Sequence, residues 1–252
     1  RGESAAARHA MAAKALESLA APPNLPWRAE TETAAADYAA NRVPPAVSPL
    51  DMAEVMLTVE RLVPEDTVYT NGAGNYSGWL HRYVRYPGLQ HHGRTQLAPT
   101  SGAMGYGVPA AIAASLLYPG RTVINVAGDG DFLMTGQELA TATGYRANQG
   151  AGRLVCLVVD NGTYGTIRMH QEREYPGRVS GSDLFNPDFA LLARAYGWRA
   201  ARVDRTEDFE AVFAQAMQAG APMLIHLVLD ADVSTTRGTL SAIREAARQA
   251  GK

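Results

Sequence analysis

Residues 122–161 read TVINVAGDGDFLMTGQELATATGYRANQGAGRLVCLVVDN. This segment contains two continuous apolar runs, TVINVA at 122–127 and RLVCLVV at 153–159, and glycine-containing polar turns follow both. A helix-like segment, FLMTGQELATATGY at 132–145, lies between the two runs. Continuous Val, Ile and Leu runs that alternate with helices are typical of parallel strands whose two faces are both covered.

The same alternation continues toward both ends of the chain. Further strands are predicted at 67–71, 198–203 and 222–230, and further helices at about 105–117, 186–197 and 206–220. We therefore expect the α/β class, with a doubly wound, mostly parallel sheet and helices on both faces.

The first 46 residues differ in composition from the rest. They are rich in Ala and Pro, with helices predicted at 4–20 and about 30–41 and with no predicted strand. We interpret 1–46 as a linker or tail and 47–252 as the main domain. Ser48 is predicted to cap a helix that has Pro49 at its first position and continues to about Arg61.

Composition excludes several classes of function. The formal net charge is −2 with both signs mixed, so neither nucleic acid nor an anionic membrane is an expected partner. No apolar run approaches the roughly 18 residues of a membrane span, and the N-terminal segment lacks the apolar core of a signal peptide. The single cysteine, Cys156, is interpreted as a buried packing residue, which fits a reducing cytoplasmic location.

Two polar turns follow the two apolar runs. GDGD at 128–131 follows the first and DNGTYG at 160–165 follows the second. If the two strands are neighbours, both turns face one crevice at the carboxyl ends of the strands, where such sheets bind ligands. Asp129, Asn161 and the carbonyl of Thr163 would then offer the hard oxygen ligands that Mg²⁺ or Ca²⁺ prefers.

The surroundings of these oxygens suit a phosphate. Gly128 and Gly130 allow the backbone to approach an anion closely, and the following helix presents its N-terminus to it. Either motif alone is typical of an ordinary turn. The pair, each at the end of an apolar strand with one helix between, favours a site for a metal and a phosphate.

Three segments carry a family resemblance: TSGAMGYGVPAAIAA at 100–114, GDGDFLMTGQELATA at 128–142 and NGTYGTIRMHQ at 161–171. Together they resemble the acetolactate-synthase-like branch of the thiamine-diphosphate-dependent enzymes. The resemblance extends over about 48–230 and corresponds to the C-terminal, diphosphate-binding domain. It implies thiamine diphosphate and Mg²⁺ as cofactors and the thiamine diphosphate-binding fold.

The resemblance also implies roles for individual residues. Asp129, Asn161 and the Thr163 carbonyl match the metal ligands. The matching cofactor-binding positions are Gly74, Asn75, Tyr76, Gly130, Asp131, Asn161, Tyr164, Gly165 and Thr166. Gly102 matches a carbonyl that accepts from the aminopyrimidine, and Met104 matches the apolar wedge that bends the cofactor. Met104 taken alone is also typical of a core residue, and Asn75 and Tyr76 of a loop and a helix cap.

Two departures from the family pattern stand out. The family's double asparagine is Asp160 followed by Asn161 here, which alters the surroundings of the metal without removing a ligand. The stretch from Asp129 to Asn161 is longer than the family usually shows. We place the surplus in a loop at 146–153, where insertions are tolerated.

The implied reaction is decarboxylation or carboligation of 2-oxo acids. The glutamate that activates the cofactor belongs to another, N-terminal domain, which no segment of this chain resembles. Glu138 lies in the helix after GDG and is not expected to be this base. A pyrimidine-binding domain or subunit from elsewhere is therefore an expected partner, in a homo- or hetero-oligomer.

Two polar clusters are further candidates. Residues 168–188 are predicted to be weakly structured, with His170, Gln171, Glu172 and Arg173 contacting a substrate carboxylate or gating the site. His91, His92 and Arg94 are a second group that lines the site. Both clusters are equally typical of a solvated surface.

Two other functions are compatible with parts of the sequence. A nicotinamide dehydrogenase would need G-x-G-x-x-G after the first strand, and GAGNYSG at 72–78 lacks the third glycine in register. A non-catalytic or regulatory module that holds the cofactor remains an alternative, because the pyrimidine-binding half is missing.

Overall fold

The computed structural model describes Lys14 and residues 27–40, 48–86, 95–145, 152–236 and 238–251. Its contacts divide the chain into residues 1–43 and 44–252. In the first unit, α2 (Arg28–Ala40) has no buried side chain. The helix predicted at 4–20 lies outside the described residues apart from Lys14. The sheet and the candidate site both belong to the second unit.

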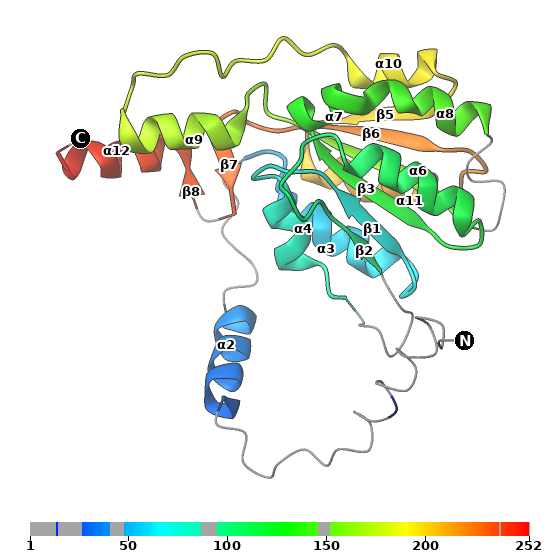
Figure 1. The fold of residues 1–252 in the computed structure, drawn as a ribbon, viewed down its shortest axis with the longest axis horizontal. Coiled ribbons are helices and arrows are strands. Elements are labelled where there is room, and N and C mark those ends of the chain that lie inside the picture. The colour runs from blue at the N-terminus through cyan, green and yellow to red at the C-terminus, as the bar shows by residue number, and fades with distance from the viewer. Residues whose placement is uncertain are drawn as a thin grey trace, which may run out of the picture. The chain divides into compact units, whose positions relative to one another are not determined.

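The second unit is built on a six-stranded sheet in the order β2-β1-β3-β4-β6-β5, in which every neighbouring pair is parallel (Figure 1). Its strands are β1 (Val68–Asn71), β2 (Gln96–Leu97), β3 (Val123–Gly128), β4 (Leu154–Asp160), β5 (Arg199–Val203) and β6 (Met223–Val228). The α/β prediction is confirmed. The two apolar runs are indeed neighbours, since β3 pairs with β4 and Gly128 lies opposite Val159.

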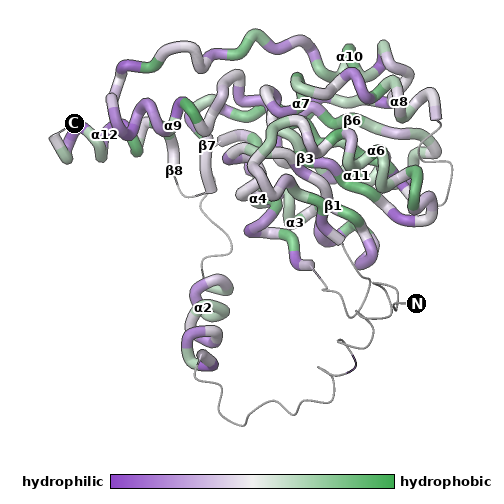
Figure 2. Tube along the Cα trace, in the orientation of Figure 1, coloured by the Kyte–Doolittle hydropathy of each residue, from purple (hydrophilic) through white to green (hydrophobic). Residues whose placement is uncertain are grey.

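Alternate residues of β4 enter two separate cores, as expected of a strand covered on both faces. Val155 and Leu157 belong to one cluster, and Cys156 and Val158 to the other. The strands are accordingly hydrophobic along their length, whereas α9 is coloured mainly as hydrophilic (Figure 2). Cys156 is buried, as predicted, and its Sγ accepts a hydrogen bond from Asn125 Nδ2 at 3.0 Å.

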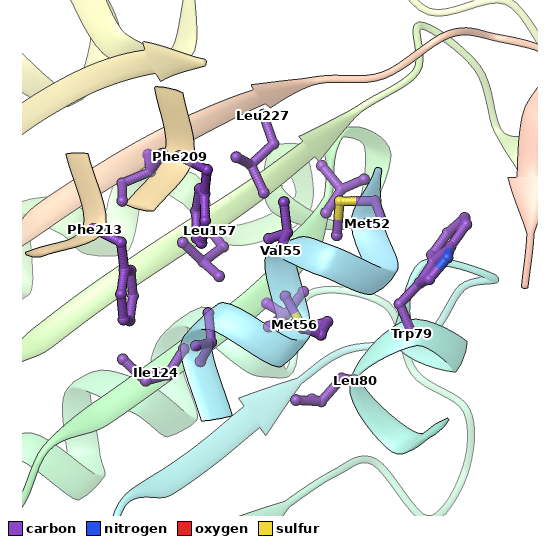
Figure 3. Packing of buried hydrophobic residues seen from close by; sticks show 14 of the residues in the cluster. Met52, Val55, Met56, Trp79, Leu80, Ile124, Leu157, Phe209, Phe213 and Leu227 are labelled. Carbon is purple, nitrogen blue, oxygen red and sulfur yellow. The ribbon is translucent and has the colours of Figure 1, made fainter. Parts of the chain in front are cut away.

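Each face of the sheet has its own set of helices. The first cluster is covered by α3 (Met52–Leu62), α4 (Ser77–Tyr83) and α11 (Thr206–Gln218), and Figure 3 shows Val55, Met56, Phe209 and Phe213 packed there against Leu157 and Leu227. The second is covered by α6 (Gly107–Leu117), α7 (Asp129–Thr135), α8 (Leu139–Gly144) and α10 (Phe189–Ala195). Burying one such large apolar side chain stabilises the fold by roughly 1.5–3 kcal/mol.

Two helix predictions were wrong in detail. The helix expected from Ser48 begins at Met52, because Asp51 is the N-cap and accepts from the Ala53 N–H at 2.8 Å. The single helix expected at 132–145 is divided by a 3₁₀ turn, η1 (Gly136–Glu138), between α7 and α8. At Gly136 a Cβ would lie 2.6 Å from the Phe132 ring, so the chain packs tightly where the helix changes.

The segment predicted to be weakly structured begins as a helix. α9 (Gly165–Glu174) includes residues 168–174 and packs against α12 (Leu240–Gln249), while the following chain runs to α10 without regular structure (Figure 1). A short antiparallel pair, β7 (Val233–Thr235) and β8 (Gly238–Thr239), precedes α12. In the described part of the chain, no helix has the length and apolarity needed to cross a bilayer.

Candidate functional site

A cavity of about 240 Å³ lies at the carboxyl ends of the central strands. Every residue predicted to hold the metal or the cofactor lines it: Gly74, Asn75, Tyr76, Gly102, Met104, Asp129, Gly130, Asp131, Asn161, Thr163, Tyr164, Gly165 and Thr166. Several other side chains that line the cavity were not predicted from the sequence, namely Trp79, Val159, Ile167, Leu229 and Ser234. Their contribution is mainly apolar, so the predicted polar groups are set in a largely apolar wall.

Asp129 links the two turns at one end of this cavity. Its Oδ1 accepts from the Gly130 N–H at 2.8 Å, and its Oδ2 accepts from the Gly162 N–H at 2.9 Å. Gly162 has φ of +68°, a conformation that glycine adopts without strain. The GDG turn and the DNG turn are therefore joined directly, which brings Asp129 beside Asn161 and Thr163.

The departure at Asp160 is accommodated by two residues that the sequence analysis missed, Asn186 and His226. His226 Nε2 lies 2.8 Å from Asp160 Oδ2. Asn186 Nδ2 donates to Asp129 Oδ2 at 2.8 Å and to Asp160 Oδ1 at 2.7 Å. An amide therefore bridges the two carboxylates, and a buried histidine supports the second.

The two carboxylates have opposite pKa shifts. Burial raises the pKa of Asp129 to about 6, with a smaller contribution from the charge of Asp160. For Asp160 burial also raises the pKa, but the hydrogen bonds from His226 and Asn186 outweigh it and the pKa is lowered. No basic side chain pairs with Asp129 among the described residues. A cation placed at Asp129 would favour its ionised form.

Two glycines leave no room for a side chain at this end. A Cβ on Gly128 would lie 2.7 Å from the Tyr76 ring, and one on Gly130 would lie 2.6 Å from the Tyr164 ring. Both are closer than real Cβ contacts come. The rings of Tyr76 and Tyr164 therefore pack directly on the backbone of these two glycines at the cavity wall.

Polar contacts join the other segments around the cavity. The Asn75 N–H donates to Thr166 Oγ1 at 3.0 Å, and the Ser234 hydroxyl donates to the Gly165 carbonyl at 3.2 Å. The loop after β1 and the start of α9 are thus held together, with the β7 strand behind them.

The opposite end of the cavity is more open. Gly102 has φ of +68°, and Met104 has 39% of its surface exposed, so the alternative that Met104 is a core residue is excluded. Tyr106, Leu133 and Met134 are also large exposed apolar side chains. Gly105 lies against Met134 and Thr135, so the loop that carries Gly102 and Met104 rests on α7.

Other predicted candidates lie elsewhere. Glu172 is 1% exposed, and both of its oxygens accept from Arg244 at 2.8 and 2.5 Å, so it joins α9 to α12 and its predicted contact with a substrate was wrong. His170 and Arg173 are exposed and contact each other, and Gln171 binds the Ser180 backbone. None of these residues lines the cavity.

Two more candidates complete the set. Glu138 accepts from the Thr141 hydroxyl at 2.6 Å at the start of α8 and does not line the cavity. His91, His92 and Arg94 lie outside the described residues, as does most of the surplus loop at 146–153.

Known proteins match the chain across this site. The family model described as "Thiamine pyrophosphate enzyme, C-terminal TPP binding domain" matches residues 72–227. An acetolactate synthase large subunit from Parasynechococcus marenigrum is 33% identical over 78% of this chain and 30% of its own length. A pyruvate oxidase from Lactiplantibacillus plantarum is 32% identical over 73% of this chain and 30% of its own length.

A solved structure agrees with these matches. The thiamine diphosphate-dependent 4-hydroxybenzoylformate decarboxylase of Rhodococcus jostii has a TM-score of 0.65 and 31% identity, over 75% of this chain and 34% of that chain. The chain thus spans about a third of the length of these relatives. With the matched segment containing the whole cavity-lining turn pair, the chain belongs to the thiamine pyrophosphate enzymes, in their acetolactate-synthase-like branch, and carries the C-terminal cofactor-binding domain.

Proposed function

We propose that this chain is the metal- and diphosphate-binding part of a thiamine-diphosphate-dependent enzyme that decarboxylates 2-oxo acids, ligates them to a second carbonyl compound, or both. The observation that carries the proposal is the cavity itself. The residues singled out for the metal and the cofactor come from four separate segments, and all of them line one hollow at the carboxyl ends of β3 and β4.

The residues at the Asp129 end fit Mg²⁺. Asp129 is a buried carboxylate that lacks a basic partner among the described residues, and burial disfavours its charge. Within the described ranges, no group of three or more His, Cys, Asp or Glu side chains gathers as a metal site. A cation here would rely on Asp129, the Asn161 amide oxygen and the Thr163 carbonyl, with phosphate oxygens and water completing the shell.

The chain's own residues divide the work between the two ends. Bound thiamine diphosphate would supply the carbon nucleophile that cleaves or joins 2-oxo acids. Asp129, Asn161 and Thr163 hold the metal, and the backbone at Gly130 and Gly165 approaches the diphosphate. Met104 and Gly102 would orient the aminopyrimidine, and the buried apolar wall formed by Trp79, Val159 and Leu229 would keep water away.

The open end of the cavity is proposed to receive the missing half of the site. Met104 lines the cavity and is also exposed, and Tyr106, Leu133 and Met134, which are close to it or to Asp131 in sequence, expose apolar surface as well, which is a costly arrangement for a surface facing only water. A pyrimidine-binding domain, from another chain or another part of a longer one, would cover it and supply the activating carboxylate. The assembly would be an oligomer and is inferred to act in the cytoplasm.

Calorimetry of thiamine diphosphate binding tests the proposal. The titration uses the full assembly with its pyrimidine-binding part, with Mg²⁺ and with EDTA in its place. Binding is expected only with the metal, and Asn161→Ala is expected to weaken it at least tenfold, as losses around a metal do. Binding of equal strength in EDTA, or no binding at all, would overturn the proposal.

A panel of 2-oxo acids separates the reaction types. Carbon dioxide release with an aldehyde product marks a decarboxylase, whereas release with a longer hydroxy-keto product marks a carboligase. Turnover of no 2-oxo acid by an assembly that binds the cofactor would favour the alternative of a non-catalytic binding module.

A further inference from the structure

Two polar side chains of α7 grip the backbone of one residue in the loop before α6. Asp131 Oδ1 accepts from the Gly105 N–H at 2.7 Å, and the Thr135 hydroxyl donates to the Gly105 carbonyl at 2.8 Å. Asp131 and Thr135 are four residues apart and so share one face of the helix. Gly105 has φ of +81°, and a Cβ there would lie 2.8 Å from Met134 Cβ, so the loop rests directly on α7.

The same carboxylate also holds a second segment. Asp131 Oδ2 accepts from the Tyr76 hydroxyl at 2.7 Å. At Gly72 a Cβ would lie 1.9 Å from Asp131 Oδ1, so only glycine lets the loop after β1 approach this close. With 3% of its surface exposed, Asp131 has both oxygens committed to protein donors.

These contacts engage the Asp131 side chain with protein donors, so only the backbone of this residue remains for the diphosphate contact that the family resemblance implies. A carboxylate that faces a diphosphate meets a like charge, and such contacts are unfavourable. The Asp131 oxygens instead serve neutral donors from two loops. One of these loops carries Gly102 and Met104, and the other carries Gly74, Asn75 and Tyr76.

We propose that Asp131 is a positioning residue that acts with Thr135 as a clamp on the Gly102–Met104 loop. The clamp fixes the residues assigned to the aminopyrimidine relative to those assigned to the diphosphate, because one carboxylate holds both loops. It rests on the proposed function, since a cofactor that spans both ends is what makes their relative placement matter. Tyr76, Asp131, Thr135 and Gly105 are its members.

The clamp is first tested in the cofactor-free protein, by hydrogen exchange across residues 98–107. Thr135→Val keeps the shape of the side chain and removes only the bond to the Gly105 carbonyl. Faster exchange is expected in Thr135→Val and Asp131→Ala. In Asp131→Asn the amide oxygen accepts from Gly105 and the amide N–H donates to the Tyr76 oxygen, so near-normal exchange is expected. Unchanged exchange in both Thr135→Val and Asp131→Ala would overturn the clamp.

The consequence for the cofactor is tested in the full assembly with Mg²⁺, by comparing thiamine diphosphate with inorganic pyrophosphate. Thr135→Val is expected to lower the affinity for thiamine diphosphate about tenfold, which corresponds to one lost hydrogen bond, and to leave the affinity for pyrophosphate unchanged. Asp131→Asn is expected to bind thiamine diphosphate within a few-fold of the unmodified protein, and Asp131→Ala much more weakly.

Two results would count against the positioning role. Equal losses for both ligands in Thr135→Val would indicate a general effect on the fold. Equal losses in Asp131→Asn and Asp131→Ala would indicate that the charge itself contacts the ligand or metal. Failure of the unmodified protein to bind either ligand would instead overturn the proposed function. The clamp would still be tested by the hydrogen-exchange experiment, which needs no ligand.

Discussion

The two ends of the cavity are built in different ways. At the metal end, Asp129 is 4% exposed and its oxygens accept from Gly130, Gly162 and Asn186. At the other end, Met104 is 39% exposed. This chain supplies all three of these donors to Asp129 by itself, whereas it leaves Met104 partly uncovered. Backbone and amide donors within one chain can hold a carboxylate in place before any ligand binds. An exposed apolar side chain, in contrast, contributes hydrophobic free energy only when a ligand or a partner surface buries it.

Among the changes considered, Asp129→Ala is expected to have the largest effect on the Asp129 end of the cavity. Because it removes the only carboxylate proposed as a metal ligand, Mg²⁺-dependent binding of thiamine diphosphate is expected to disappear in calorimetry. Asp204→Ala removes an exposed carboxylate at the end of β5 and serves as the matched control. Retention of metal-dependent binding in Asp129→Ala would show that the ligand assignment is wrong.

A pH series tests the Asp129 end of the cavity separately. The pKa of Asp129 is about 6 in the folded protein, above its ordinary value of 3.8, so its contribution to stability is full below about pH 3.8 and is lost as pH rises through about 6. Mg²⁺ competes with the proton for the same oxygens. The rise in Tm caused by Mg²⁺ is therefore expected at pH 7–8 and to fade below pH 6.

The pH series also has an internal control. Asp129→Asn is expected to show no Mg²⁺-dependent rise in Tm at any of these pH values. A rise in Tm of constant size from pH 5 to pH 8 in the unmodified protein would place the metal elsewhere.

Asn186→Ala is expected to have a smaller effect of the same kind. It removes the amide that bridges Asp129 and Asp160, and groups that orient a metal ligand typically contribute about tenfold to metal affinity. Phe185→Ala changes the neighbouring, fully exposed side chain and is the control. Equal Mg²⁺ affinity in the two variants would mean that Asn186 does not position Asp129.

Met104→Ala is expected to have the smallest effect on the chain by itself. Because Met104 is 39% exposed, truncation removes only part of the packing of a buried side chain, so the loss of unfolding free energy in chemical denaturation should stay below the roughly 2–5 kcal/mol of a fully buried methionine. In the full assembly the same variant should lower cofactor affinity or turnover. A large loss of stability in the chain alone would mean that Met104 is already packed within this chain.

The features predicted well from sequence are those with local signals. β3 and β4 are continuous apolar runs with glycine turns at their ends, so the parallel sheet was predicted from local pattern. The meeting of the two turns was predicted on the condition that the strands are neighbours, and β3 does pair with β4. The helix start at Asp51 was missed because Ser48 and Pro49 carry an equally good local signal. Contacts of residues 49 and 51 with Thr206, far along the chain, accompany the start actually used.

The features that were missed depend on distant contacts. Asn186 lies in an irregular segment and His226 in an apolar strand, and nothing in either surrounding sequence points to the Asp129–Asp160 pair. Glu172 was mistaken for a surface residue because its partner, Arg244, lies on a helix near the end of the chain. The sequence did contain one signal, Asp160 at the position where the family has an asparagine. A buried carboxylate needs hydrogen-bond donors, and Asn186 and His226 contact it.

The position of β4 in the sheet also has a consequence for how the chain is made. β4 pairs with β3 on one side, but its other neighbour is β6, whose Met223 lies opposite Val155. During synthesis, β4 therefore has one unpaired edge until the ribosome has translated β6, which ends at Val228. An unpaired apolar edge invites pairing with other nascent chains. Chains that terminate between β4 and β6 should therefore aggregate, even though they contain all of the residues proposed to bind the metal.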